Sequence, residues 1–150
     1  MKTAQDIMTK NVVWVTVDTS VRDLARVLLN NNISGVPVLD KSDTLCGIAT
    51  ESDLIFQNKR LHVPPFITIL DSFLFLDNPE KMDQELKKIA GATVLEIYTE
   101  DVVTITPDTP LDEIATIMTE KKIHTLPVLS EAGEMVGVVG KKDIIRTILS

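Results

Sequence analysis

The fold is decided by a short stretch that the chain contains twice: ISGVPVL at residues 33–39 and IHTLPVL at residues 123–129. The match extends outward without a gap, so that residues 3–55 align with residues 93–145 at a constant offset of 90 positions. Sixteen of these 53 pairs are identical. Two copies are too few for a solenoid, which stacks several units to bury its core. We therefore expect a pseudo-symmetric pair of repeats, packed face to face with a groove between them.

Each copy has the pattern β-α-β-β-α, which places the chain in the α+β class. Apolar residues recur at helical spacing after Asp18 and Thr19, which we expect to cap the first helix of the copy. In the first copy the predicted elements are a strand at 12–17, a helix from the Asp18–Thr19 cap, hairpin strands at 36–39 and 45–49, and a helix from Asp53; the second copy repeats them 90 residues later.

The repeats divide the chain into three parts: repeat 1 at residues 1–60, an insert at 61–91, and repeat 2 at 92–150. The insert is almost wholly apolar over residues 61–76, and Asn78-Pro79 then indicates the start of a helix. Two interpretations of the insert are open. It covers one end of the core, or it forms a subunit interface, because dense apolar surface needs a cover.

Composition narrows the class of protein. A formal net charge of −7 argues against binding to a nucleic acid polymer, which needs a basic face. No apolar stretch reaches the length of a membrane span, and the first residues do not resemble a signal peptide. The single Cys46 supports neither a disulfide framework nor a zinc site. We therefore expect a cytoplasmic protein with no membrane partner.

Three groups of residues in each copy resemble the CBS domain, a family named after cystathionine β-synthase. In the first copy they are DIMT at 6–9, ISGVPV at 33–38 and GIATESD at 47–53. CBS domains occur in tandem, and a pair is called a Bateman module. The resemblance implies two repeats packed through their sheets, with two clefts that commonly bind adenine nucleotides or other adenosyl ligands.

The family motif Gly-h-x-Ser/Thr-x-x-Asp, where h is apolar, suggests how a ligand is held. By the resemblance, Asp53 accepts hydrogen bonds from both ribose hydroxyls, and Thr50 lies near the phosphate. The free N–H groups at a helix start suit an anionic phosphate. The same Thr50-x-x-Asp53 pattern is also an ordinary helix capping box. In the second copy Gly140 replaces the threonine, whereas Asp143 is retained.

The resemblance predicts two unequal sites, each drawing on both repeats. We expect the stronger site at Asp53, because it has Thr50 where the other has Gly140 and His124 where the other has Ser34; Lys141 and Lys142 are candidates for added positive charge there. The predicted residues of the stronger site are Thr50, Asp53, Thr99, Val102, Val103, Ile123, His124 and Pro127. Those of the weaker site are Thr9, Val12, Val13, Ile33, Ser34, Pro37 and Asp143.

We therefore expect a non-catalytic regulatory module, without a required cofactor, a catalytic residue or a metal site, that binds an adenosyl ligand and signals to an effector protein as a homodimer. The first candidates for the ligand are AMP, ADP and ATP; S-adenosylmethionine, NAD and a cyclic dinucleotide follow. One alternative is a ligand-free homodimeric interaction module acting through the apolar 61–76 segment. Another is a small hydrolase that uses His124. Ligand screening by thermal shift, together with an assay for nucleotide turnover, separates the three.

Overall fold

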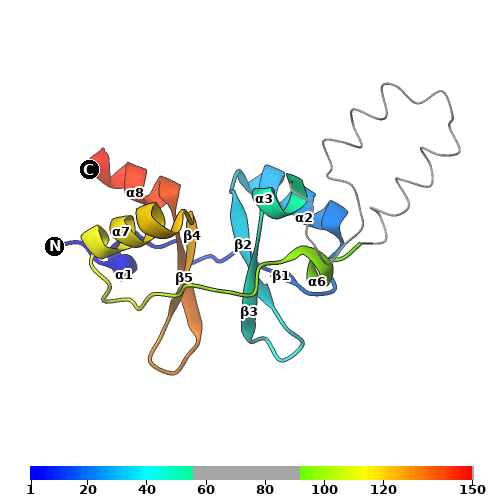
Figure 1. Cartoon of the computed structure of the whole chain (residues 1–150). Helices are drawn as coiled ribbons and strands as arrows, with labels where there is room; N and C mark the ends of the chain where they lie inside the picture. The colour runs from blue at the N-terminus through cyan, green and yellow to red at the C-terminus, as the bar shows by residue number, and fades with distance from the viewer. Residues whose placement is uncertain (56–91, 150) are drawn as a thin grey trace, which may run out of the picture.

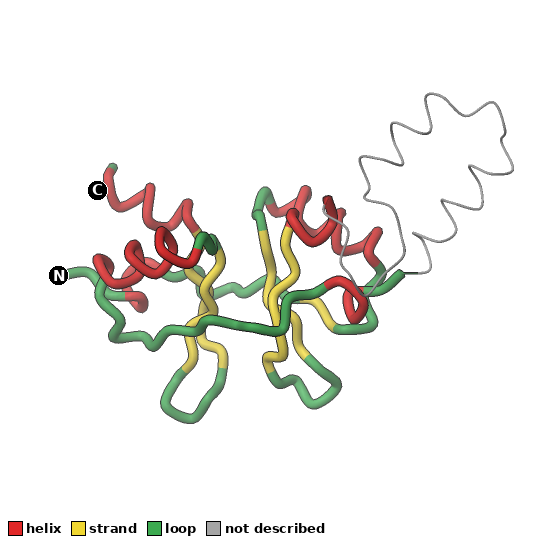
Figure 2. The backbone as a smooth tube through the Cα atoms, in the orientation of Figure 1, coloured by secondary structure: helices red, strands yellow, loops and turns green. Residues whose placement is uncertain are grey.

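The computed structural model describes residues 1–55 and 92–149, which form two similar halves side by side (Figure 1). The backbone trace in Figure 2 shows a hairpin of strands with helices at one end in each half. The elements are α1 (Ala4–Ile7), β1 (Val15–Thr16), α2 (Val21–Asn31), β2 (Gly35–Leu39), β3 (Leu45–Thr50), α3 (Glu51–Ile55), α6 (Val94–Ile97), α7 (Leu111–Lys121), β4 (Thr125–Leu129), β5 (Met135–Gly140) and α8 (Lys141–Ile148).

The sheets confirm the α+β class and the two hairpins. Strand β2 pairs antiparallel with β3 and parallel with β1, and β4 pairs antiparallel with β5. The leading strand of each copy is shorter than predicted. Only Val15 and Thr16 form β1, and in the second copy Ile105 alone makes a parallel bridge to Val128. Val12 and Val13 precede this pairing and lie outside the strands.

The helix caps differ from the prediction. Ser20, not Asp18 or Thr19, caps α2, and its hydroxyl accepts a hydrogen bond from the backbone N–H of Asp23 at 3.0 Å. Thr19 instead closes the preceding turn, since its hydroxyl accepts from the N–H of Thr16 at 3.1 Å. In the second copy Pro110 occupies the cap position of α7, and Thr109 closes the equivalent turn. The prediction placed each helix start one or two residues too early.

Each half has its own hydrophobic core, and each core borrows its first helix from the other repeat. The core around α2 and β2 includes Ala92, Val94 and Ile97 from the start of repeat 2. The core around α7 and β4 includes Ala4, with Ile7 packed against it. The first segment of each repeat therefore packs in the half that the other repeat forms. This exchange ties the repeats together, because neither core is complete without residues of the other copy.

The repeated glycines make room for the crossing segments. The backbones of Thr99 and Ile48 exchange two hydrogen bonds, of 2.8 and 3.0 Å, where the chain passes over β3. A Cβ atom on Gly47 would meet the Tyr98 ring there and lie 2.6 Å from the Thr99 carbonyl oxygen. On the other side, a Cβ atom on Gly137 would lie 2.5 Å from Sδ of Met8. A side chain at Gly47 would push the crossing segment away from the sheet, whereas one at Gly137 would displace the side chain of Met8.

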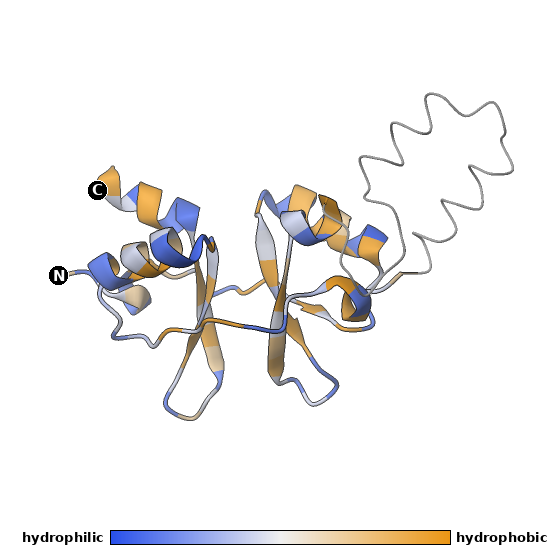
Figure 3. Cartoon of the chain, in the orientation of Figure 1, coloured by the Kyte–Doolittle hydropathy of each residue, from blue (hydrophilic) through white to orange (hydrophobic). Residues whose placement is uncertain are grey.

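The halves meet through β2 and β4. A Cβ atom on Gly35 would lie 2.8 Å from the Thr125 hydroxyl, and these two residues correspond to each other across the 90-residue offset. The pseudo-two-fold axis therefore passes between them, which agrees with repeats packed through their sheets. Figure 3 shows apolar residues in the strands and in the helices around them, and polar residues in the hairpin turns.

The insert predicted at 61–91, with its apolar segment at 61–76 and its helix from Asn78, lies outside the described residues. Its two interpretations remain predictions. Among the residues that the structure describes, no helix has the length and apolar character needed to cross a membrane.

Candidate functional site

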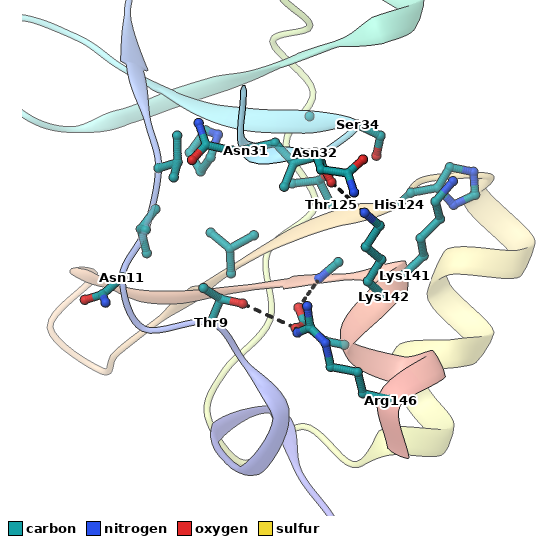
Figure 4. A pocket seen from close by; sticks show the side chains of 18 residues that line it. Thr9, Asn11, Asn31, Asn32, Ser34, His124, Thr125, Lys141, Lys142 and Arg146 are labelled. Carbon is teal, nitrogen blue, oxygen red and sulfur yellow. Dashed lines mark hydrogen bonds and ion pairs between the residues drawn. The ribbon is translucent and has the colours of Figure 1, made fainter. Parts of the chain in front are cut away.

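A cavity of about 260 Å³ opens between the two repeats beside Asp143 (Figure 4). Both repeats contribute to its wall. One side comes from the chain after α1 and from the α2–β2 junction, and the other from β4, β5 and the start of α8. The lining residues are Thr9, Asn11, Val12, Val13, Asn31, Asn32, Ile33, Ser34, Gly35, Pro37, His124, Thr125, Val138, Gly140, Lys141, Lys142, Asp143 and Arg146.

Asp143 lies in the first turn of α8, and its side chain is only 8% exposed. Its Oδ2 accepts the backbone N–H of Gly140 at 2.8 Å, which caps the helix without a hydroxyl at the cap position. Its Oδ1 accepts from Arg146 at 2.9 Å and from the Thr9 hydroxyl at 3.3 Å. A carboxylate offers about four acceptor positions. Three donors therefore leave one position open, and the 68% exposed Arg146 can swing aside to open another.

The wall contributed by repeat 1 has an apolar part beside the polar residues Thr9, Asn11, Asn31, Asn32 and Ser34. Val12, Val13 and Ile33 are half-buried, and Pro37 in β2 is buried. Val12 and Val13 are available to line the cavity because β1 begins only at Val15. An apolar part and a carboxylate in one cavity suit a ligand with one apolar end and one hydroxyl-bearing part.

Cations gather on the repeat 2 side of the cavity. Lys141 and Lys142 open α8, Arg146 follows one turn later, and His124 precedes β4 (Figure 4). Three cations and one carboxylate give the lining a formal charge of +2 with His124 neutral, in a chain of net charge −7. Lysines at a helix start oppose the helix dipole, at a cost of about 0.3–1 kcal/mol each. An anion bound in the cavity would offset that cost.

The corresponding group at Asp53 is built differently. Its Oδ2 accepts the N–H of Thr50 at 3.0 Å and the Thr50 hydroxyl at 3.2 Å, and its Oδ1 accepts the Thr99 hydroxyl at 3.2 Å. Burial raises the pKa of the Asp53 carboxyl above its usual range, and the hydrogen bonds from Thr50 and Thr99 act in the opposite direction. Thr50 also accepts the N–H of Asp53 at 3.3 Å. The capping-box interpretation of this motif is therefore confirmed, and it leaves the ligand role open.

The structure brings all seven residues predicted for the Asp143 site together around one cavity. Of the residues predicted for the Asp53 site, Thr50, Asp53 and Thr99 are joined by hydrogen bonds. Val102 is half-buried, Val103 and Ile123 pack against the core of the second half, and Pro127 is buried in β4. Ligand binding by either set stays a prediction.

Three basic residues that the sequence assigned to the Asp53 site line the cavity beside Asp143. They are His124, Lys141 and Lys142. The reason is that the start of α8 faces the same cavity as its own aspartate, and the residue before β4 lies next to that helix start.

Sequence reasoning missed Arg146 and Asn32. Arg146 is three positions after Asp143, a spacing that places two side chains on one helix face, and this signal was available. Asn32 ends α2 in the left-handed conformation, with φ of 52°, and its carbonyl oxygen accepts a 2.7 Å hydrogen bond from the Lys142 ammonium. No local pattern predicts that contact, because it joins residues 110 positions apart.

Comparison with known proteins agrees with this architecture. The family model described as "CBS domain" matches residues 4–58 and 94–150. An uncharacterized protein of Methanocaldococcus jannaschii is 31% identical over 97% of this chain and 90% of its own length. The inosine-5'-monophosphate dehydrogenase of Nitrosopumilus maritimus is 26% identical over 96% of the chain, which spans only 24% of that enzyme.

Solved structures show the same fold. The CBSX2 protein of Arabidopsis thaliana, crystallised with AMP, superimposes with a TM-score of 0.71 at 24% identity, over 99% of this chain and 97% of that one. The CBS domain pair of protein MJ0100, crystallised with 5'-methylthioadenosine and S-adenosyl-L-methionine, gives a TM-score of 0.69 at 24% identity, over 99% and 96% of the two chains. At this level of identity the likeness establishes the fold alone.

Proposed function

The chain belongs to the CBS domain family, and from that premise we propose that it is a regulatory module which binds an adenosyl ligand in the cavity beside Asp143. The observation that carries the proposal is that one cavity joins an apolar part of the wall from repeat 1 to a buried carboxylate and a group of cations from repeat 2. Two CBS-pair structures with the same fold hold adenosyl compounds, AMP in one and methylthioadenosine with S-adenosylmethionine in the other.

The cavity chemistry matches the three parts of an adenine nucleotide. The adenine ring packs against Val12, Val13 and Ile33, which lie outside the strands. The ribose hydroxyls donate to Asp143, at the position opened when Arg146 moves aside. The phosphates lie toward the N–H groups at the start of α8 and toward its two lysines.

The charge of the cavity separates the candidate ligands. S-adenosylmethionine carries a cationic sulfonium, which a lining of formal charge +2 disfavours. The volume of about 260 Å³ lies just below the usual range of small-molecule pockets, about 300–1,000 Å³, and therefore favours the smaller candidates over NAD or a cyclic dinucleotide. We therefore place AMP, ADP and ATP first.

The Asp53 group is the second proposed site, and we reverse the predicted order of the two. At the start of α3, Glu51 and Ser52 stand where α8 has Lys141 and Lys142. A carboxylate at that position repels phosphate, whereas a lysine attracts it. Thr50 offers a hydroxyl, but that hydroxyl already takes part in the capping box with Asp53.

The proposal includes a readout by another protein, with the module working as a homodimer in the cytoplasm. Ligand occupancy shifts such a module only if the ligand binds its two arrangements with different affinity. Helix α8 offers a contact surface, because Ile145, Ile148 and Leu149 are 55%, 78% and 87% exposed at its end. Apolar surface of this kind is typical of protein contacts. No catalytic step is part of the proposal.

The test is thermal shift against AMP, ADP, ATP, S-adenosylmethionine, NAD and cyclic dinucleotides, followed by isothermal titration calorimetry. We expect adenine nucleotides to raise the melting temperature, and Asp143→Ala to weaken binding by about 10- to 100-fold, because a charged hydrogen-bond acceptor is lost. The matched control, Asp53→Ala, should leave this binding within about threefold. Absence of any ligand effect would favour the interaction module, and turnover of the nucleotide would favour the hydrolase.

A further inference from the structure

Thr125 carries a buried hydroxyl in the wall of the cavity. The residue is the first of β4, it is 9% exposed, and it lines the cavity beside Asp143 (Figure 4). Among the residues that the structure describes, its hydroxyl has no hydrogen-bond partner. A buried polar group without a partner destabilises a folded protein, and such groups are rare. The hydroxyl is therefore available to a molecule that enters the cavity.

The other buried polar side chains in the described part of the chain are satisfied. The hydroxyl of Thr109, which is also 9% exposed, accepts a hydrogen bond from the N–H of Thr106 at 3.0 Å. The carboxylate of Asp143 accepts three hydrogen bonds. Thr125 therefore differs from Thr109, a residue of the same type and burial, in lining the cavity and in having an unpaired hydroxyl.

The hydroxyl lies at the buried end of the cavity, where the two halves meet. Thr125 and Gly35 correspond across the 90-residue offset and belong to the strands β4 and β2, which join the halves. A Cβ atom on Gly35 would lie 2.8 Å from Oγ1 of Thr125, so the glycine leaves room for this hydroxyl. Both residues are buried, whereas Lys141, Lys142 and Arg146 in the same lining are exposed.

This distribution of charge decides which part of a ligand reaches Thr125. A phosphate stays near the exposed cations, because burying an ion away from a countercharge is costly. Asp143, the other buried polar side chain of the lining, is itself an anion and repels phosphate. The uncharged part of the ligand therefore occupies the buried end. A hydroxyl suits polar atoms of that part, because it can both donate and accept a hydrogen bond.

We infer that the hydroxyl of Thr125 forms a hydrogen bond with the nucleoside part of the ligand and contributes to its recognition independently of the phosphates. This inference rests on the proposed function and adds a neutral contact to it. The hydroxyl breaks no bond within the described residues when it meets the ligand, so the new hydrogen bond replaces none. The Asp53 group has no equivalent, because Gly35 occupies this position in repeat 1.

The test compares adenosine, AMP and ADP in the wild-type protein and in variants of Thr125. Calorimetry measures the affinity for AMP and ADP, and displacement of bound AMP measures the affinity for adenosine. Thr125→Val removes the hydroxyl and keeps the shape of the side chain. We expect all three affinities to fall by the same factor, about 3- to 10-fold, because one hydrogen bond between neutral groups is lost. Thr125→Ser keeps the hydroxyl and should bind within about twofold of the wild type.

Melting temperatures of the ligand-free proteins distinguish a ligand contact from a structural role. Thr125→Val should melt at or above the temperature of the wild type, because it removes an unpaired buried hydroxyl. The matched control, Thr109→Val, should melt at a lower temperature, because it breaks the hydrogen bond to Thr106, and should bind all three ligands as the wild type does. A lower melting temperature of Thr125→Val would show a structural hydroxyl and overturn the inference.

The binding results separate this inference from the proposed function. If the wild-type protein binds neither AMP nor ADP, the proposed function and the role of Thr125 both fail. If both nucleotides bind and Thr125→Val binds them as tightly as the wild type, only the role of Thr125 is overturned. The same follows if the loss differs between adenosine and the nucleotides, because the contact would then lie at a phosphate. Failure of adenosine to displace AMP from the wild type would also overturn recognition of the nucleoside part.

Discussion

The starts of helices α3 and α8 occupy the same place in the two repeats and carry opposite charge. Helix α3 begins with Glu51-Ser52-Asp53, and α8 begins with Lys141-Lys142-Asp143. An acidic residue at a helix start favours the helix, whereas a lysine there costs stability. The start of α3 thus stabilises its helix, whereas the start of α8 is suited to an anion. The two copies thus share their packing and differ in the charge at this helix start.

The largest expected effect tests the shared packing. Gly47→Ala places a methyl group against the Tyr98 ring and the Thr99 carbonyl oxygen, whereas Gly137→Ala meets only the flexible side chain of Met8. We expect Gly47→Ala to lower the free energy of unfolding by about 2–3 kcal/mol, and Gly137→Ala by about 1 kcal/mol. Urea denaturation followed by circular dichroism measures both. Equal losses would show that the two crossings are equally tight.

Exchanging the helix starts tests the difference directly. Lys141→Glu combined with Lys142→Ser gives α8 the first turn of α3. We expect the affinity for ADP to fall about 10- to 100-fold and the free energy of unfolding to rise by about 0.5–1 kcal/mol, because the helix dipole is then favoured. Calorimetry and urea denaturation give the two values.

The reciprocal variant, Glu51→Lys with Ser52→Lys, serves as the control for that exchange. It should lower stability and add affinity at the Asp53 site. If the exchange in α8 lowered the affinity for ADP without raising the free energy of unfolding, it would contradict the view that the two lysines cost the helix stability.

The Arg146–Asp143 ion pair gives a smaller effect. Asp143 is almost fully buried in this pair, whereas the Arg26–Asp23 pair has the same spacing with both side chains more than half exposed. We expect Arg146→Ala to cost about 0.5–1 kcal/mol of unfolding free energy and Arg26→Ala to cost about 0–0.5 kcal/mol. Raising the salt concentration should reduce both values. A larger loss in Arg26→Ala would contradict this ranking.

The smallest effect concerns the pH dependence that Asp53 contributes. Burial raises the pKa of its carboxyl in the folded protein above the unfolded value of 3.8, so protonation favours the folded state. The contribution of Asp53 to stability is present below pH 3.8 and is lost as the pH rises through the folded pKa. Relative to the wild type, Asp53→Asn should therefore gain stability as the pH rises through this window. Urea titrations at several pH values measure the difference in the free energy of unfolding. A stability of Asp53→Asn that falls relative to the wild type as the pH rises would contradict the raised pKa.

Much of the scaffold could be predicted because its signals are local. The apolar runs at 36–39 and 45–49 predicted the first hairpin, and the 90-residue offset carried each element to the second copy. The exchange of α1 and α6 between the cores could not be predicted, because those contacts join segments distant in the sequence. Gly47 and Gly137 were visible as repeated residues, but only the structure shows the chain that crosses them.

The cavity beside Asp143 combines residues that the sequence assigned to two different sites. The family resemblance assigned Thr9, Val13 and Asp143 to one site, and these residues line one cavity. The lysines were assigned to the opposite site, since the sequence does not show which way a helix start faces. The Lys142–Asn32 contact depends on the relative position of the two halves, and that position is set by the packing of β2 against β4.

The most direct test of the account is a crystal structure of the protein grown with ADP. We predict the nucleotide between the repeats, with adenine against Val12 and Val13, the ribose hydroxyls on Asp143, and the phosphates at Lys141 and Lys142. ADP bound only beside Asp53, with the Asp143 cavity empty, would contradict the central claim. So would a cavity that remains empty at saturating ADP.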